Sequence, residues 1–115
     1  MLTLSARTVI TLEVFGHMIR AARLERKMPQ AELAERLGVS RQTISALERG
    51  DAKVAVGAVF EAATIVGIPL LTDNARDLQR LSTTVAHLAS LLPERARTAK
   101  GSWIMTSKPQ SADSA

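Results

Sequence analysis

Residues 40–49 carry side chains that could form hydrogen bonds with the edges of nucleic-acid bases. Arg41 presents a guanidinium group and Gln42 a carboxamide. In the major groove of DNA, a guanidinium group can form two hydrogen bonds with guanine, and a carboxamide can form two with adenine. Other polar or basic side chains lie in the same segment: Ser40, Thr43, Ser45 and Arg49. The segment is therefore predicted to present a short polar and basic surface suited to bases and phosphates.

Two short helices within residues 29–50 are predicted to position these side chains. The first helix has aliphatic residues three and four positions apart, which places them on one face: Leu33, Ala34 and Leu37. Gly38 can adopt positive φ and end this helix, and Ser40 can cap the next one. In the second helix Ile44 and Leu47 face inward, opposite the polar side chains. Two helices joined by a tight glycine turn form the motif that places one helix in the DNA major groove.

A helical hairpin that only packs inside a bundle would also have inward aliphatic residues and a polar outer face. Such a hairpin does not require glycine at position 38, a Ser-Arg-Gln start at 40–42 or a Glu-Arg-Gly end at 48–50. These three features favour a DNA-binding helix-turn-helix.

Three more helices are predicted around this unit, which makes the chain all-α with five helices. The first begins between Ser5 and Thr11, both possible caps, and ends near Lys27. Its buried stripe comprises Leu12, Phe15, Ile19 and Ala22. The fourth helix covers residues 55–66 and is ended by Gly67. Its core face comprises Val59, Ala62, Ala63 and Val66.

The fifth helix is predicted over residues 72–92, with Thr72 or Asp73 as its cap and Pro93 beyond its end. Leucine or valine recurs there with the spacing of a coiled-coil seam: Leu71, Leu78, Leu81, Val85, Leu88 and Leu92. Such a stripe either packs on its own domain or pairs with a second copy. A palindromic DNA site requires two copies related by a twofold axis. We therefore expect a homodimer with these contact residues: Leu78, Leu81, Val85, Leu88 and Leu92.

Residues 15–71 resemble the Cro/repressor helix-turn-helix family, also called xenobiotic-response-element-like (XRE-like) regulators. The residues that carry the resemblance are Gly16, Ile19, Arg23, Gln30, Leu33, Ala34, Gly38, Val39, Ser40, Ile44, Leu47, Glu48, Gly50 and Gly67. The resemblance implies a five-helix, lambda-repressor-like domain that binds double-stranded DNA at a palindromic operator.

The resemblance also implies roles for particular side chains. Arg41 and Gln42 would read bases, while Gln30 would contact a phosphate and brace Gln42. Arg23 and Glu48 would form a buried ion pair between the first and third helices. The full set expected at the DNA is Gln30, Ser40, Arg41, Gln42, Thr43, Ser45, Arg49 and Lys53.

Within this family, three segments resemble HipB-like antitoxins: residues 59–61, 67–71 and 91–97. That resemblance implies a repressor of its own operon that also binds a HipA-like serine/threonine kinase toxin and holds it inactive. Two other functions stay open. The chain could be a stand-alone Cro/repressor-type regulator, or a protein-interaction module whose helix-turn-helix does not bind DNA.

Composition agrees with a small DNA-binding regulator and gives no support for catalysis. The net charge is +4, and residues 17–53 hold eight Lys or Arg against five Asp or Glu, which favours a polyanionic partner. Cysteine is absent, and the sequence has no glycine-rich phosphate loop, Gly-x-Ser-x-Gly motif or histidine cluster. We therefore expect no enzyme activity, no cofactor and no metal. Without a signal peptide or a membrane span of ~20 apolar residues, the expected location is the cytoplasm.

The predicted organisation has three parts. Residues 1–71 form the helix-turn-helix domain with its core at 29–50, and residues 72–92 form the dimer helix. Residues 93–115 form a basic, flexible tail that contains Trp103, the one tryptophan of the chain.

Overall fold

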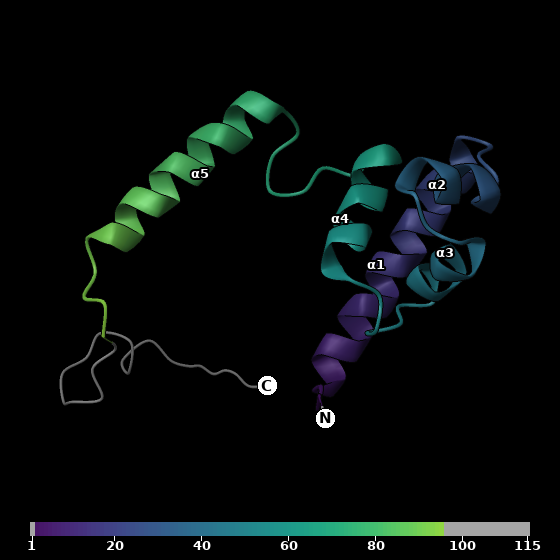
Figure 1. Ribbon diagram of the computed structural model, residues 1–115, viewed down its shortest axis with the longest axis horizontal. Coiled ribbons are helices and arrows are strands. Elements are labelled where there is room, and N and C mark those ends of the chain that lie inside the picture. The colour runs from purple at the N-terminus through teal and green to yellow at the C-terminus, as the bar shows by residue number, and fades with distance from the viewer. Residues whose placement is uncertain (1, 96–115) are drawn as a thin grey trace. The chain divides into compact units, whose positions relative to one another are not determined.

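The computed structural model describes residues 2–95, which form five helices in chain order (Figure 1). These helices are α1 (Ala6–Glu25), α2 (Gln30–Leu37), α3 (Arg41–Glu48), α4 (Val56–Ile65) and α5 (Ala75–Ser90). Over the same residues the only β feature is an isolated bridge between Leu70 and Thr72. The predicted all-α class with five helices is confirmed. Trp103 and residues 96–115 of the predicted basic tail lie outside the described residues.

The described part of the chain divides into two units, one before and one after the junction between Leu78 and Gln79. The first contains α1 to α4 and the first turn of α5, and the second contains the rest of α5. None of the helices within residues 2–95 combines the length and hydrophobicity that a membrane crossing requires.

Local backbone conformation and capping explain where α1 begins and ends and where α2 ends. The Ser5 hydroxyl accepts a hydrogen bond from the amide of Thr8 at 3.2 Å, so α1 starts at Ala6. It stops at Glu25, two residues before the predicted end, and Lys27 then takes a positive φ of 54°. Gly38 ends α2 with φ 75°, in the left-handed conformation that its lack of a Cβ allows.

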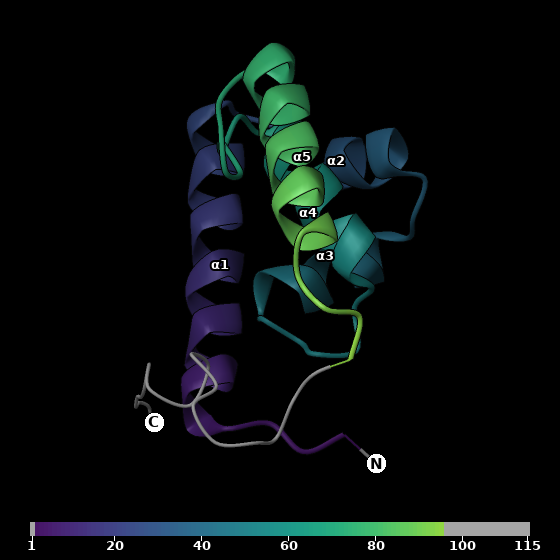
Figure 2. The same cartoon turned by 90° about the vertical axis from the view of Figure 1, so that its left-hand side faces the viewer.

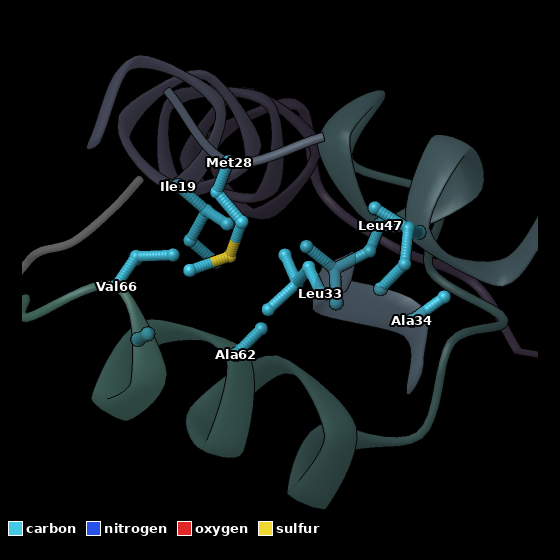
Figure 3. Close-up of a cluster of buried hydrophobic side chains, with 9 residues drawn as sticks. Ile19, Met28, Leu33, Ala34, Leu47, Ala62 and Val66 are labelled. Atoms are coloured by element: carbon cyan, nitrogen blue, oxygen red, sulfur yellow. The ribbon is translucent and has the colours of Figure 1, made fainter. Parts of the chain in front are cut away.

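The core lies between α1, α2, α3 and α4, where aliphatic side chains from all four helices converge (Figure 3). Its buried hydrophobic members are Ile19, Met28, Leu33, Ala34, Ile44, Leu47, Ala62, Ala63 and Val66. In Figure 2 α2, α3 and α4 lie on the same side of α1. The short α3 is thus held from one side by α1 and α2, which contribute Ile19 and Leu33 to the shared core.

Two glycines allow α1 and α3 to approach closely. A Cβ at Gly16 would lie 2.5 Å from the carbonyl oxygen of Glu48 and 2.8 Å from that of Leu47. A Cβ at Gly50 would lie 2.7 Å from the backbone nitrogen of Glu13. All three distances are shorter than a carbon atom tolerates, so the end of α3 sits directly on the backbone of α1.

The predicted start and cap of α5 are wrong. The helix begins at Ala75, three residues later than expected. The Asn74 side chain accepts from the amide of Asp77 at 2.8 Å, which makes Asn74 the cap in place of Thr72 or Asp73. The physical reason is the backbone before it. Leu71 has a positive φ of 69° and is flanked by the bridge between Leu70 and Thr72, so helical geometry cannot start there.

The apolar stripe of α5 is shorter than predicted. Leu71 precedes the helix and Leu92 follows its last residue, Ser90, so neither extends the helical seam. The remaining stripe comprises Leu78, Leu81, Val85 and Leu88. No residue of α5 is buried, and Val85 and Leu88 are 53% and 56% exposed.

Candidate nucleic-acid interface

The first turn of α3 carries the residues that were predicted to read bases. Ser40 is its cap, and the Ser40 hydroxyl accepts from the amide of Thr43 at 3.2 Å. The two hydroxyl groups of Ser40 and Thr43 also share a hydrogen bond of 3.1 Å. These hydroxyls fix the start of α3, and Arg41 and Gln42 lie on its first turn.

Five of the predicted contact residues are exposed, the capping residue Ser40 among them. The other four have long polar side chains: Arg41, Gln42, Arg49 and Lys53. Within residues 2–95 their side chains form no hydrogen bond or ion pair. Unpaired guanidinium, amide and ammonium groups are available to an incoming anion or base edge. Around α3 and the loop after it, three cations and one amide thus have no side-chain partner among residues 2–95.

A buried ion pair ties α1 to α3 behind this surface. Nε of Arg23 donates to Oε2 of Glu48 at 2.6 Å, and Nη2 donates to Oε1 at 3.1 Å. Nη1 donates to the carbonyl of Met28 at 2.8 Å. The side chains are only 6% and 4% exposed, so both charges have been removed from water. Their hydrogen bonds compensate that desolvation only while both partners are present.

Gln30, the first residue of α2, extends this network toward the polar face of α3. Its Nε2 donates to Oε1 of Glu48 at 3.0 Å, and its Oε1 accepts from the hydroxyl of Ser45 at 3.4 Å. The expected brace between Gln30 and Gln42 is replaced by these two contacts, because a carboxylate is a stronger acceptor than an amide. Nε2 carries two N–H groups, so one stays available to a phosphate.

The structure therefore separates the predicted DNA-contact residues into two groups. Gln30, Ser40, Thr43 and Ser45 form hydrogen bonds within the domain, whereas the side chains of the other four are free. The Gln30–Glu48 contact was not predicted. No short-range pattern in the sequence indicates this contact, because the two residues are eighteen positions apart and meet only when α1, α2 and α3 have packed.

A comparison with protein families assigns this segment. A family model described as helix-turn-helix matches residues 19–71. Residues 19–71 have the helix-turn-helix fold. No curated protein and no solved structure gave a match to the chain.

The helix-turn-helix domain includes every element of the candidate interface. The match begins at Ile19 inside α1, so it contains Arg23, Glu48 and the exposed residues of α3. It supports the resemblance to the Cro/repressor-type family and indicates a DNA-binding transcription regulator. The match ends at residue 71, and α5 lies beyond it.

Proposed function

We propose that the chain is a sequence-specific transcription regulator that places α3 in the DNA major groove. The observation that carries this proposal is the free pair of Arg41 and Gln42 on the first turn of α3. Helix-turn-helix proteins read bases mainly with the N-terminal residues of the second helix of the motif. The buried pair of Arg23 and Glu48 holds the opposite end of α3 at a fixed position on α1.

Each exposed side chain then has a distinct task. Arg41 pairs with a guanine and Gln42 with an adenine, so these two residues set the preferred sequence. Arg49 and Lys53 contact phosphates and fix the register of the domain along the duplex. Gln30 adds a phosphate contact through its second N–H group.

Removing Arg41 should relax the sequence preference. The preferred site is first selected from random duplex DNA, and binding of Arg41→Ala and Lys53→Ala is then followed by fluorescence anisotropy. We expect Arg41→Ala to lose ~1–3 kcal/mol of binding free energy at the selected site and to accept other bases at one position. Lys53→Ala should weaken all sequences alike and flatten the salt dependence by about one phosphate contact. An unchanged base preference in Arg41→Ala would show that it does not read bases.

We further propose that α5 joins two copies for binding to a palindromic site. This helix has an aliphatic stripe that is not buried: Leu78, Leu81, Val85 and Leu88. Such a stripe is expected of a helix that packs against a second chain.

Leu88→Asp should weaken binding to the palindromic site and leave binding to an isolated half-site unchanged, because only the palindrome requires a dimer. The matched control is Thr83→Asp, which lies on the opposite face of α5 and should alter neither affinity. Both affinities are measured at protein concentrations near the dissociation constant. If Leu88→Asp binds the palindrome like the unmodified protein, α5 is not the dimer contact.

The HipB-like antitoxin function is a finer proposal, supported by the sequence resemblance of residues 59–61, 67–71 and 91–97. It is tested by expressing the tagged chain with its neighbouring genes and weighing the purified complex by native mass spectrometry. A kinase-sized protein at fixed stoichiometry would support the antitoxin. A chain that binds its upstream DNA without such a partner would be a stand-alone regulator.

A further inference from the structure

Within the part of the chain that the structure describes, the outer face of α1 carries exposed aliphatic side chains. Ile10, Val14 and Leu24 are 57%, 49% and 50% exposed. They lie on the side of α1 opposite Ile19, which is fully buried, and Figure 2 shows α2, α3 and α4 on one side of this helix. A helix at the surface of a domain normally has one apolar face and one polar face. A second apolar face of this length indicates a partner.

The exposed residues of this face follow a heptad repeat. Steps of four and three residues connect Ile10, Val14, His17, Ala21 and Leu24, and all five are exposed. This is the spacing of the seam of a coiled coil. The helix has 20 residues and is about 30 Å long, so the seam extends over most of α1.

We propose that this seam binds the same face of α1 in a second copy of the chain, with the two helices antiparallel. In the antiparallel register, Val14 packs against His17 of the second copy and Ile10 packs against its Ala21. The residues beside the seam then determine whether the pairing is favourable. Glu13 and Arg20 occupy equivalent flanking positions, seven residues apart, and in this register Glu13 faces Arg20 of the second copy.

The charges on this flank of α1 are therefore complementary to the charges on the same flank of a second copy. Twofold symmetry generates the contact twice, which gives two ion pairs between copies. Within residues 2–95 the ion pairs are Arg23–Glu48 and Arg36–Glu32, so Glu13 and Arg20 are free to form them. A parallel pairing would instead place Arg7 against Arg7 of the second copy, because parallel helices match identical seam positions.

This interface does not rest on the proposed DNA binding. The seam lies on the side of α1 away from Gly16, where the helix meets the end of α3. It also uses no residue of α5, so the two contacts between copies can be removed separately.

The first experiment measures mass by sedimentation in the full-length Leu88→Asp variant, where the proposed α5 contact is absent. We expect an average mass that rises from one chain toward two with increasing concentration. Adding Val14→Asp should leave one chain at every concentration, while adding Thr11→Asp, an exposed position beside the seam, should not abolish dimers. Circular dichroism verifies that each variant stays helical. A Leu88→Asp protein that is monomeric at every concentration overturns the proposal.

The second experiment tests the antiparallel register by exchanging charges in the same background. Glu13→Arg alone and Arg20→Glu alone each place like charges together twice, which should weaken self-association about tenfold. The double variant Glu13→Arg/Arg20→Glu should restore it. An equimolar mixture of the two single variants should form heterodimers in preference to homodimers, since their charges are then complementary.

Preferential heterodimers cannot arise from a structural role within one chain, because Glu13 and Arg20 lie two turns apart on the same helix. Parallel helices would instead place Arg20 opposite Glu25 of the second copy. If adding Glu25→Arg restores the self-association of the Arg20→Glu variant, and adding Glu13→Arg does not, the helices are parallel and the proposed register is wrong.

Discussion

Replacing Glu48 with alanine is expected to lower the free energy of unfolding by about 3–5 kcal/mol. The substitution leaves the guanidinium group of Arg23 buried, 6% exposed, without its counter-charge. It also removes the acceptor of the Gln30 amide. Small domains have only about 5–15 kcal/mol of stability, so much of the folded state would be lost. Urea unfolding followed by far-ultraviolet circular dichroism measures the change.

The matched control is Glu32→Ala. Glu32 also pairs with an arginine four residues away, Arg36, at 2.7 Å, but the two side chains are 42% and 54% exposed. Exposed pairs of this kind contribute roughly 0.3–0.5 kcal/mol. Equal losses in Glu48→Ala and Glu32→Ala would mean that the buried pair does not hold α1 to α3. The double variant Arg23→Leu/Glu48→Leu should lose less than the sum of its two single variants, since neither charge is then left alone.

Gly16→Ala is expected to destabilise the domain by roughly 1–3 kcal/mol, although alanine is the better helix former. The added methyl group would lie 2.5 Å from the Glu48 carbonyl oxygen, and α3 would have to move away from α1. The same substitution at Gly57, inside α4, meets no atom within 4 Å. Gly57→Ala should therefore stabilise the domain by about 0.5–1 kcal/mol.

Thermal unfolding of these two alanine variants provides the comparison. Opposite signs are the expected outcome, because helix propensity acts at both positions and the steric conflict acts at one. If Gly16→Ala is as stable as Gly57→Ala, the close approach between α1 and α3 is not rigid. DNA binding by Gly16→Ala should weaken along with stability, since displacement of α3 also displaces Arg41.

The features that depend on neighbouring residues were predictable from the sequence. Gly38 ends α2 and Ser40 caps α3 because backbone conformation and a nearby hydroxyl decide both outcomes locally. Ile44 and Leu47 are buried as the helical spacing predicts. The start of α5 was not predictable in the same way. Three consecutive residues, 72–74, can each cap a helix, and the backbone at Leu71 determines which one does.

The candidate site shows the same division. Exposure of Arg41 and Gln42 follows from the pattern of α3, whereas the partner of Gln30 depends on how three helices meet. The outer seam of α1 was not predicted from the sequence, because the helix carries aliphatic residues on two faces. The buried stripe, which includes Ile19, already accounts for the pattern of an amphipathic helix. Only the exposed fractions of the side chains distinguish this buried stripe from the outer seam.

The hydrogen bonds that connect Arg23, Glu48, Gln30 and Ser45 have a consequence for how new specificities can evolve. They orient α3 without using the side chains of Arg41 or Gln42, which project into solvent. Exchanging those two residues should therefore change the preferred operator while leaving the fold intact. With bases read as proposed, stability and base recognition would be carried by different residues of one short helix. One or two substitutions would then be enough to change the target of a related regulator.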